Sequence, residues 1–327
     1  MACSGVIRLS GIGFGTWAWG NQLVWGYDPA RDDPRLSRTF RCAIDAGLTL
    51  IDTADSYGTG RLNGRSEALL GTFVEALPPA MRSRPWIATK LAPFPWRLGR
   101  RGMDRAFKAS HERLKGHLRR VQLHWSTARY APWQEDALLD GLADLVLAGR
   151  VQELGVSNVG PQNLARIQKR LMQRGVRLSS VQIQFSLLAP GDLRLHQILD
   201  QARGLDVQVL AYSPLAFGIL CVAPEQELTS TTQLRKRLNQ RLLPASRQLR
   251  EGIKAIASDR CVSAVQVALN WCRAHGTTPI PGIRTPEQAT DVAGALGWDL
   301  SDQERASLDR LRRACDKRMP SNPFQSD

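Results

Sequence analysis

Four ionisable side chains stand at or just after the ends of three successive apolar runs in the first half of the chain. Asp52 and Tyr57 follow one run, Lys90 ends the next, and His124 lies near the end of the third. A phenol, with a pKa of ~10, is a poor acid at neutral pH unless a nearby cation stabilises its phenolate. Lys90 can supply that cation, Asp52 can hold the ammonium in place, and His124 can donate a hydrogen bond to a substrate oxygen. Singly each residue has an ordinary structural explanation, but together they indicate proton transfer.

The first two of these side chains belong to a unit of strand, loop and helix, residues 48–71, LTLIDTADSYGTGRLNGRSEALLG. Its apolar start predicts a strand, its three glycines predict a loop, and its last third predicts a helix. Ser66 is expected to cap that helix, and Glu67 suits its positive end. Polar groups at the carboxyl end of a strand are where α/β proteins usually place chemistry.

Strand-like and helical runs alternate along most of the chain. The predicted strands cover 11–17, 48–52, 85–90, 120–125, 151–156, 180–185, 206–212 and 278–282. The predicted helices cover 36–46, 66–77, 104–118, 134–149, 161–174, 192–204, 246–258 and 262–275. Eight parallel strands with crossover helices predict a (β/α)8 TIM barrel, in which the four ionisable side chains meet at one mouth. No G-x-G-x-x-G joins a strand to a helix, which argues against a Rossmann unit.

The remaining segments complete a chain that we expect to be one domain over residues 1–327. Residues 286–296 and 301–313 predict additional C-terminal helices, 213–245 shows little periodicity, and 319–327, with two prolines, is expected to be frayed.

Composition sets limits on the class of protein. The chain has 327 residues, 43% of them hydrophobic, and no apolar run of the ~20 residues that span a bilayer. Its start lacks the long apolar region of a signal peptide, so we expect a soluble, cytoplasmic protein with no membrane partner. The six cysteines are scattered without C-x-x-C pairs, which predicts neither a metal site nor a disulfide framework.

The net charge of +14 raises the question of a nucleic-acid partner. The basic residues are spread at helical spacing, without the interleaved aromatic residues that a single-strand binder requires. We therefore expect no nucleic-acid partner, although the surplus can attract an anionic ligand over long range.

The motifs resemble those of the aldo-keto reductases along nearly the whole chain, and the ordered set is far more specific than any one piece. The pieces are GFGTWAWG at 13–20, DTADSYG at 52–58, GRSEALLG at 64–71, ATK at 88–90, LHW at 123–125, GVSN at 155–158, VQIQFSLL at 181–188, AYSPLAFG at 211–218, QVALNWC at 266–272 and IPGIRTPEQ at 280–288. The resemblance implies an NADPH-dependent oxidoreductase that reduces an aldehyde or ketone to an alcohol. It makes Tyr57 the proton donor, tuned by Lys90 and Asp52, with His124 polarising the carbonyl.

The resemblance also implies a set of cofactor contacts. Ser157, Asn158 and Gln182 match residues that hold the nicotinamide carboxamide, and Tyr212 matches the aromatic residue on which the ring stacks. The residues implied for the pyrophosphate loop are Ser213, Pro214, Leu215 and Gly218, those for the adenosine and its 2′-phosphate are Gly282, Arg284, Gln288 and Asp291, and those that line the mouth are Gly15, Thr16 and Trp17.

The chain departs from the family pattern at three places on the cofactor side. Asp291-Val292 replaces the common Glu-Asn, so an adenine contact is expected to be lost, and Cys221-Val222 replaces a common Gly-Lys. Gln288 stands where relatives carry an arginine, which leaves Arg284 to grip the 2′-phosphate in two parallel hydrogen bonds. NADPH is therefore the expected cofactor, with NADH possible.

Two functional classes fit this pattern. One is an active carbonyl reductase, and the alternative is a cofactor-binding regulatory or redox-sensor subunit with slow turnover, as the potassium-channel β-subunits of this family are. Substrate choice in such barrels comes from loops over the mouth, here 18–35, 91–103 and 125–133, whose aromatic and basic residues suit an apolar or anionic carbonyl compound or else simply pack the loops. The sequence gives no indication of the substrate or of the oligomeric state.

Overall fold

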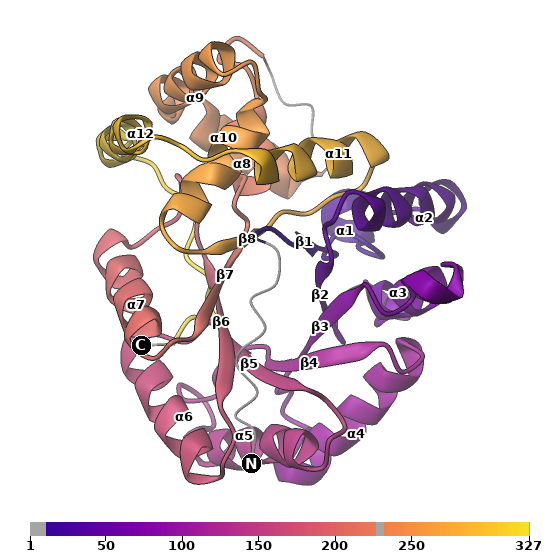
Figure 1. The fold of residues 1–327 in the computed structure, drawn as a ribbon. Coiled ribbons are helices and arrows are strands. Elements are labelled where there is room, and N and C mark those ends of the chain that lie inside the picture. The colour runs from indigo at the N-terminus through magenta and orange to yellow at the C-terminus, as the bar shows by residue number, and fades with distance from the viewer. Residues whose placement is uncertain (1–10, 227–231, 327) are drawn as a thin grey trace.

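Eight parallel strands, hydrogen-bonded in chain order, form the centre of the molecule in this computed structural model, which describes residues 11–226 and 232–326. Helices surround the strands, and the last helices gather beside β7, β8 and β1 (Figure 1). The predicted (β/α)8 barrel with C-terminal helices is confirmed. The strands are β1 Phe14–Gly15, β2 Leu50–Ala54, β3 Trp86–Leu91, β4 Leu118–Leu123, β5 Glu153–Ser157, β6 Leu178–Gln184, β7 Gln208–Tyr212 and β8 Thr278–Ile280.

Hydrogen bonds between the first and last strands close the barrel. Gly13 N donates to Pro279 O at 3.0 Å, Gly15 N donates to Pro281 O at 2.9 Å, and Gly15 pairs with Gly282 in an isolated bridge. A Cβ on Gly13 would lie 2.7 Å from Leu50 O, so only glycine lets β1 approach β2 this closely. The glycines predicted to allow close backbone approach at the first strand therefore do so.

Twelve α-helices and four 3-10 helices connect or follow the strands within the described residues. The α-helices are α1 Gln22–Trp25, α2 Pro29–Asp45, α3 Arg65–Glu75, α4 Gly99–Arg113, α5 Pro132–Leu147, α6 Pro161–Gln173, α7 Asp192–Gly204, α8 Gln233–Ala245, α9 Arg247–Asp259, α10 Ala264–Ala274, α11 Pro286–Gly294 and α12 Asp302–Ala314. The 3-10 helices are η1 Gly60–Leu62, η2 Pro79–Met81, η3 Ala216–Cys221 and η4 Ala295–Gly297.

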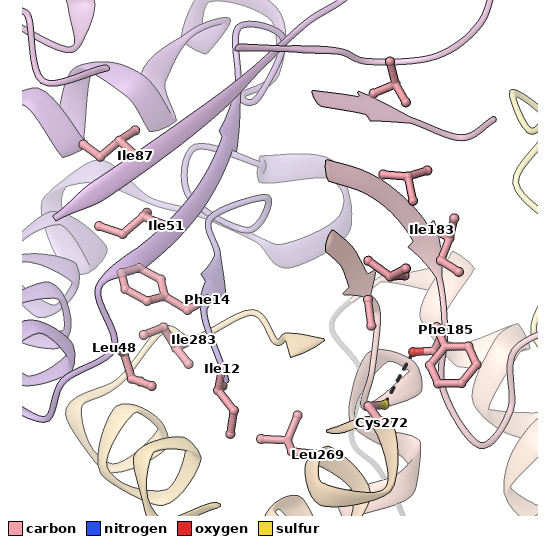
Figure 2. Close-up of a cluster of buried hydrophobic side chains, with 14 of the residues drawn as sticks. Ile12, Phe14, Leu48, Ile51, Ile87, Ile183, Phe185, Leu269, Cys272 and Ile283 are labelled. Atoms are coloured by element: carbon pink, nitrogen blue, oxygen red, sulfur yellow. Dashed lines mark hydrogen bonds between the residues drawn. The ribbon is translucent and has the colours of Figure 1, made fainter. Parts of the chain in front are cut away.

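Strand alternation divides the side chains into two sets. One set points outward toward the helices and includes Phe14 of β1, Ile51 of β2 and Ile87 of β3, which belong to the large buried core together with Ile283 (Figure 2). The other set points into the barrel, where Leu50, Leu210 and Ile280 form a small separate apolar cluster. The register continues this alternation upward, with Ala54 opposite Lys90, Lys90 opposite Gln122 and Ser157 opposite Gln182. The interior of the barrel is therefore lined by this apolar cluster at its lower end and by polar side chains toward the carboxyl ends of the strands.

Several local predictions differ from the structure. Helix α2 starts at Pro29, seven residues before the predicted start at Leu36, because Asp28 caps it by accepting from Ala30 N at 3.0 Å and a proline fits its first turn. Ser66 does not cap α3, because Gly64 is the N-cap and the Ser66 hydroxyl instead donates to Thr16 Oγ1 at 2.7 Å. The weakly periodic stretch 213–245 contains η3 and α8.

The C-terminal residues also differ from the prediction of a frayed tail. Met319 and Ser326 are only 3% and 2% exposed, and the backbone N–H of Met319 donates to Leu188 O at 2.8 Å. Residues 1–10 with Cys3, residues 227–231 of the weakly periodic stretch, and Asp327 lie outside the described residues. Among the described residues, no helix combines the length and the apolar character needed to cross a bilayer.

Candidate active site

An ion pair at the carboxyl ends of β2 and β3 forms the base of the site. The Lys90 ammonium contacts Asp52 Oδ2, and the two residues are 1% and 3% exposed. Burial alone would lower the pKa of Lys90, but the negative charge of Asp52, with Tyr57, outweighs it and raises that pKa. The amine is therefore held as a buried cation.

Two glutamine side chains hold the other oxygen of the same carboxylate. Gln122 Nε2 donates to Asp52 Oδ1 at 3.1 Å, and Gln182 Nε2 donates to it at 2.7 Å. Gln122 was not among the predicted site residues, although it lies two residues before His124 and so on the same side of β4. Room for it comes from Gly155, where a Cβ would lie 3.0 Å from Gln122 Cγ. Four strands of the barrel therefore fix the position of one carboxylate.

Tyr57 lies directly above this pair, in the loop after β2. Lys90 Nζ is 4.8 Å from the centroid of the Tyr57 ring. Burial raises the pKa of Tyr57, Lys90 lowers it by its charge and a hydrogen bond, and Asp52 raises it again. Lys90 therefore acts in the expected direction, but burial outweighs it, so the net direction is upward and the phenol is held protonated.

His124 completes the predicted four. Its ring centroid is 5.9 Å from that of Tyr57 in an edge-on arrangement, and Nδ1 is 3.4 Å from Ser56 Oγ. Burial, and then the positive charges of Lys90 and Arg97, hold the pKa of His124 well below its usual value. The imidazole is therefore neutral at physiological pH and keeps one N–H to donate. The structure thus brings all four predicted side chains together at the mouth.

The residues predicted to hold the nicotinamide gather on the opposite side of the mouth, at or near the carboxyl ends of β5, β6 and β7. Asn158, in the left-handed region at φ 58°, donates from Nδ2 to His124 O at 3.1 Å and to Ser157 Oγ at 3.0 Å. The Tyr212 hydroxyl donates to Asn158 Oδ1 at 2.9 Å, and Gln182 is engaged with Asp52 as described above. The predicted set is therefore contiguous, but much of its hydrogen-bonding capacity is used within the protein.

The loop that follows Tyr212 has an unusual backbone. Ser213, Ala216 and Phe217 have φ values of 51°, 47° and 58°, and Gly218 has 91°. Non-glycine residues rarely occupy this region, so three in six residues indicate a loop whose shape is imposed by its surroundings. This loop, which also contains Pro214 and Leu215, folds toward β1 and places Phe217 5.7 Å from Trp17 between ring centroids.

Two arginines and a tryptophan form a cationic cluster beside this loop. The guanidinium carbons of Arg235 and Arg284 lie 4.3 Å and 4.9 Å from the centroid of a Trp25 ring. Burial lowers the pKa of both groups, and for Arg284 the positive charges of Arg235 and Arg35 lower it further. No carboxylate among the described residues forms an ion pair with either of the two. Arg235 was missed because it lies in the aperiodic stretch, and Trp25 was assigned to a substrate loop.

The remaining predicted cofactor residues lie near the junction of β1 and β8, and some of them are exposed whereas others are buried. Gly282 is exposed beside Gly15, whereas Gln288 Oε1 accepts from Arg284 N at 2.8 Å and so shapes the loop. Asp291 Oδ1 accepts from Ser263 Oγ at 2.6 Å and from Gln266 Nε2 at 3.0 Å, which ties α11 to α10. Thr16 is fully buried, with its hydroxyl donating to Asp52 O at 3.1 Å, so it supports β2 and does not line the mouth.

Aromatic side chains form a continuous wall beside His124. Trp125 has its ring centroid 4.9 Å from that of His124, 5.9 Å from that of Phe94 and 4.6 Å from that of Phe324. Trp96 stacks on Phe94 at 4.7 Å and is 69% exposed, and Phe324 is 48% exposed. Phe94, Trp96 and Trp125 come from loops predicted to choose the substrate, whereas Phe324 comes from the tail that was expected to be frayed.

Comparison with known proteins assigns this arrangement to a family. The sequence profile described as "Aldo/keto reductase family" matches residues 11–313. Pyridoxal reductase, chloroplastic, from Arabidopsis thaliana is 43% identical over 98% of this chain and 88% of its own length. Methylglyoxal reductase YeaE from Escherichia coli is 27% identical over 94% of this chain and 92% of its own length. A crystal structure of an aldo-keto reductase from Klebsiella pneumoniae in complex with NADPH has a TM-score of 0.71 and 27% identity, covering 96% of this chain and 95% of that one.

Proposed function

Because the chain belongs to the aldo/keto reductase family and is an oxidoreductase, we propose that it uses NADPH to reduce a small aldehyde to an alcohol, with Tyr57 as the proton donor. The observation that carries the proposal is the buried Asp52–Lys90 ion pair directly beneath the Tyr57 ring. A buried charge pair of this kind, at the mouth of a barrel and below a titratable phenol, is typical of a site that moves a proton.

The cationic cluster supports NADPH as the cofactor. Arg235 and Arg284 hold two guanidinium groups against Trp25 without an acidic partner among the described residues. Guanidinium groups suit phosphate because they can bind it through two parallel hydrogen bonds, and because burial lowers the pKa of both groups we expect a nearby anion to stabilise their charged forms. Of the predicted contacts to the 2′-phosphate, we retain Arg284 and add Arg235. Val292, where the family pattern has an asparagine, is buried at 2% exposure.

Each residue of the site then has a part in proton transfer. When bound, the reduced nicotinamide supplies the hydride that goes to the carbonyl carbon. The neutral His124 ring donates a hydrogen bond to the carbonyl oxygen and orients it toward Tyr57. Tyr57 Oη gives its proton to that oxygen as negative charge develops there, and the Lys90 ammonium stabilises the phenolate that remains. A raised pKa does not prevent this transfer, because an alkoxide is a much stronger base than a phenolate.

A flat aromatic aldehyde is the substrate that the aromatic wall favours. Trp125 lies beside His124 and Phe94 packs edge-on against Trp125, so a planar ring can pack against this wall. The plant relative described above is named for the reduction of pyridoxal, which is such an aldehyde. We therefore propose pyridoxal as the first substrate to test, with methylglyoxal, the substrate named for the bacterial relative, as the small aliphatic comparison.

A Tyr57→Phe variant tests the assignment of the proton donor. We expect kcat/KM for pyridoxal to fall by about 10²- to 10⁴-fold, because general acid catalysis contributes about this much. The dissociation constant of NADPH, measured by fluorescence titration, is expected to stay within a factor of two or so, since the hydroxyl acts in the transition state and not on the cofactor. Undiminished turnover by the variant would exclude Tyr57 as the donor. One slow turnover by the native protein on every aldehyde, with retained cofactor, would instead favour a regulatory subunit.

A further inference from the structure

The C-terminal tail, residues 315–326, crosses the mouth of the barrel above β6, β5 and β4. It leaves α12, where Arg312 donates to the carbonyl oxygens of Ser186 and Leu187, each at 3.0 Å. Further along the tail, Ser326 N donates to Asn158 O at 3.0 Å. The tail is thus anchored at its base by buried groups and reaches the side of the mouth where the nicotinamide residues lie.

Asn322, near the tip of the tail, makes the contact that matters for the cofactor. Its Nδ2 donates to Asn158 Oδ1 at 3.0 Å and to the Tyr212 hydroxyl at 2.9 Å. Its own Oδ1 accepts from Phe324 N at 3.0 Å, so a local turn holds the amide in this orientation. Asn322 therefore joins two residues that the family resemblance assigns to the nicotinamide.

The hydrogen-bonding capacity of Asn158 is completely used in this arrangement. A primary amide has two N–H donors and two acceptor sites on its oxygen. Both donors are engaged, with His124 O and Ser157 Oγ, and both acceptor sites are engaged, with Tyr212 and Asn322. Three of these four partners belong to the barrel, and Asn322 alone comes from the tail. A further donor can reach Asn158 Oδ1 only if one partner leaves.

We propose that Asn322 is a displaceable plug: its carboxamide occupies the acceptor site on Asn158 that the nicotinamide carboxamide uses, so cofactor binding moves the tip of the tail away. This inference rests on the proposed NADPH-dependent function. The two groups that compete are both primary carboxamides, so Asn158 Oδ1 cannot favour one over the other by chemical type. Affinity for NADPH is accordingly reduced by the fraction of molecules in which the tail is docked.

The tip of the tail, residues 320–325, can move while Met319 and Ser326 on either side of it stay in place. Met319 is buried and bonded to Leu188 O, and Ser326 is 2% exposed and bonded to Asn158 O, whereas Phe324 between them is 48% exposed and stacks on Trp125. Pro320 and Pro323 flank the segment, and each lacks an N–H that could tie it down. When the tip leaves, the Trp125 face beside His124 is uncovered as well, which couples cofactor entry to access for the substrate.

The first test compares two ligands on two variants of the full chain. Asn322→Ala removes the competing amide, and Ser321→Ala, at an exposed neighbouring position, serves as the matched control. We expect Asn322→Ala to bind NADPH about fivefold to tenfold more tightly than the native protein, measured by fluorescence titration. The affinity for 2′-phospho-ADP-ribose, which lacks the nicotinamide, should be the same in all three proteins, because only the carboxamide competes with Asn322.

The second test follows the tail itself. Chymotrypsin cleaves after Phe324, and mass spectrometry reports the loss of the last three residues. Saturating NADPH should accelerate this cleavage in the native protein, and 2′-phospho-ADP-ribose should not. Unchanged or weaker NADPH binding by Asn322→Ala, or protection of Phe324 by NADPH, would overturn the plug. A native protein that binds neither ligand would overturn the proposed function instead.

Discussion

The charged Lys90 ammonium is almost completely buried, and the ion pair with Asp52 compensates for the loss of its hydration. Breaking a buried pair leaves an uncompensated charge, whereas replacing both members by neutral groups removes the desolvation cost as well. The pair is therefore an energetic unit, and its two members should not contribute additively to stability.

A double-variant cycle in urea checks this coupling. We expect Lys90→Met to lower the free energy of unfolding by about 3–5 kcal/mol, because it strands the Asp52 carboxylate. Adding Asp52→Asn should recover part of the loss, since the amide can still accept from Gln122 and Gln182. A double variant whose loss equals the sum of the two single losses would show that the residues act independently.

Asp55 gives the site a second buried carboxylate, with a different behaviour toward pH. Burial raises its pKa to about 6, against the lowering effect of Arg97, with which it forms an ion pair. The folded protein therefore binds more protons than the unfolded chain between pH ~4 and 6, and stability falls as pH rises through that window. Between pH 4 and 7 we expect the free energy of unfolding of the native protein to fall by about 3 kcal/mol relative to that of Asp55→Asn, because the pKa of Asp55 is raised by about two units. Chemical unfolding at several pH values measures this, and parallel curves would contradict it.

Among the elements, β5 must carry a glycine at position 155, because side chains of the two adjacent strands occupy the space that a Cβ would need. A Cβ on Gly155 would lie 2.4 Å from Ser180 Oγ, on the adjacent β6, in addition to its close approach to Gln122. We expect Gly155→Ala to destabilise the protein by about 1–3 kcal/mol, as overpacking does. Adding Ser180→Ala should restore much of the lost stability, because it removes the nearest atom. Gly204→Ala serves as the control and should be nearly neutral, because a Cβ there meets nothing within 4 Å. Equal thermal stability of Gly155→Ala and the native protein would contradict the argument.

The elements were predictable from sequence where a periodic apolar pattern specified them, and less so elsewhere. All eight strands were found, because strands buried on both faces read as continuous apolar runs, and so were the helices α3 to α7 and α9 to α12. The start of α2 was missed because Pro34 within the helix resembles a loop residue, and α8 because its basic residues hide any apolar stripe. The four side chains predicted to be catalytic lie together as expected, but the contacts of Gln122, Arg235 and Asn322 depend on tertiary packing that no local pattern records.

Across the whole molecule, the excess positive charge is distributed unevenly. On α5 and α6, acidic residues spaced by four face arginines spaced by four, and the contacts include Arg166–Asp136, Arg170–Asp140 and Arg174–Asp144. Charge on that side is largely compensated. Around Arg284, by contrast, the neighbouring charges that act on it are mostly positive, from Arg235, Arg35 and Arg31, with Asp32 opposing them.

For the proposed NADPH site, this uneven charge distribution predicts that cofactor affinity depends on ionic strength. We expect the dissociation constant of NADPH to rise by about an order of magnitude between low salt and 0.5 M NaCl, and that of NADH to rise less, because NADH lacks the 2′-phosphate. Arg284→Ala should weaken NADPH far more than NADH and should flatten its salt dependence. Equal losses for the two cofactors would place the 2′-phosphate elsewhere.

The seam between β1 and β8 has a consequence for how the protein is made. Trp19 Nε1 donates to Ile283 O at 2.9 Å across 264 residues of sequence, so the ring cannot be completed until nearly all of the chain has left the ribosome. Until then β1 and β7 are open edges, each able to pair with a foreign strand. Nascent chains that stop short of β8 should therefore be the aggregation-prone species, and refolding should be slow and favoured by dilution.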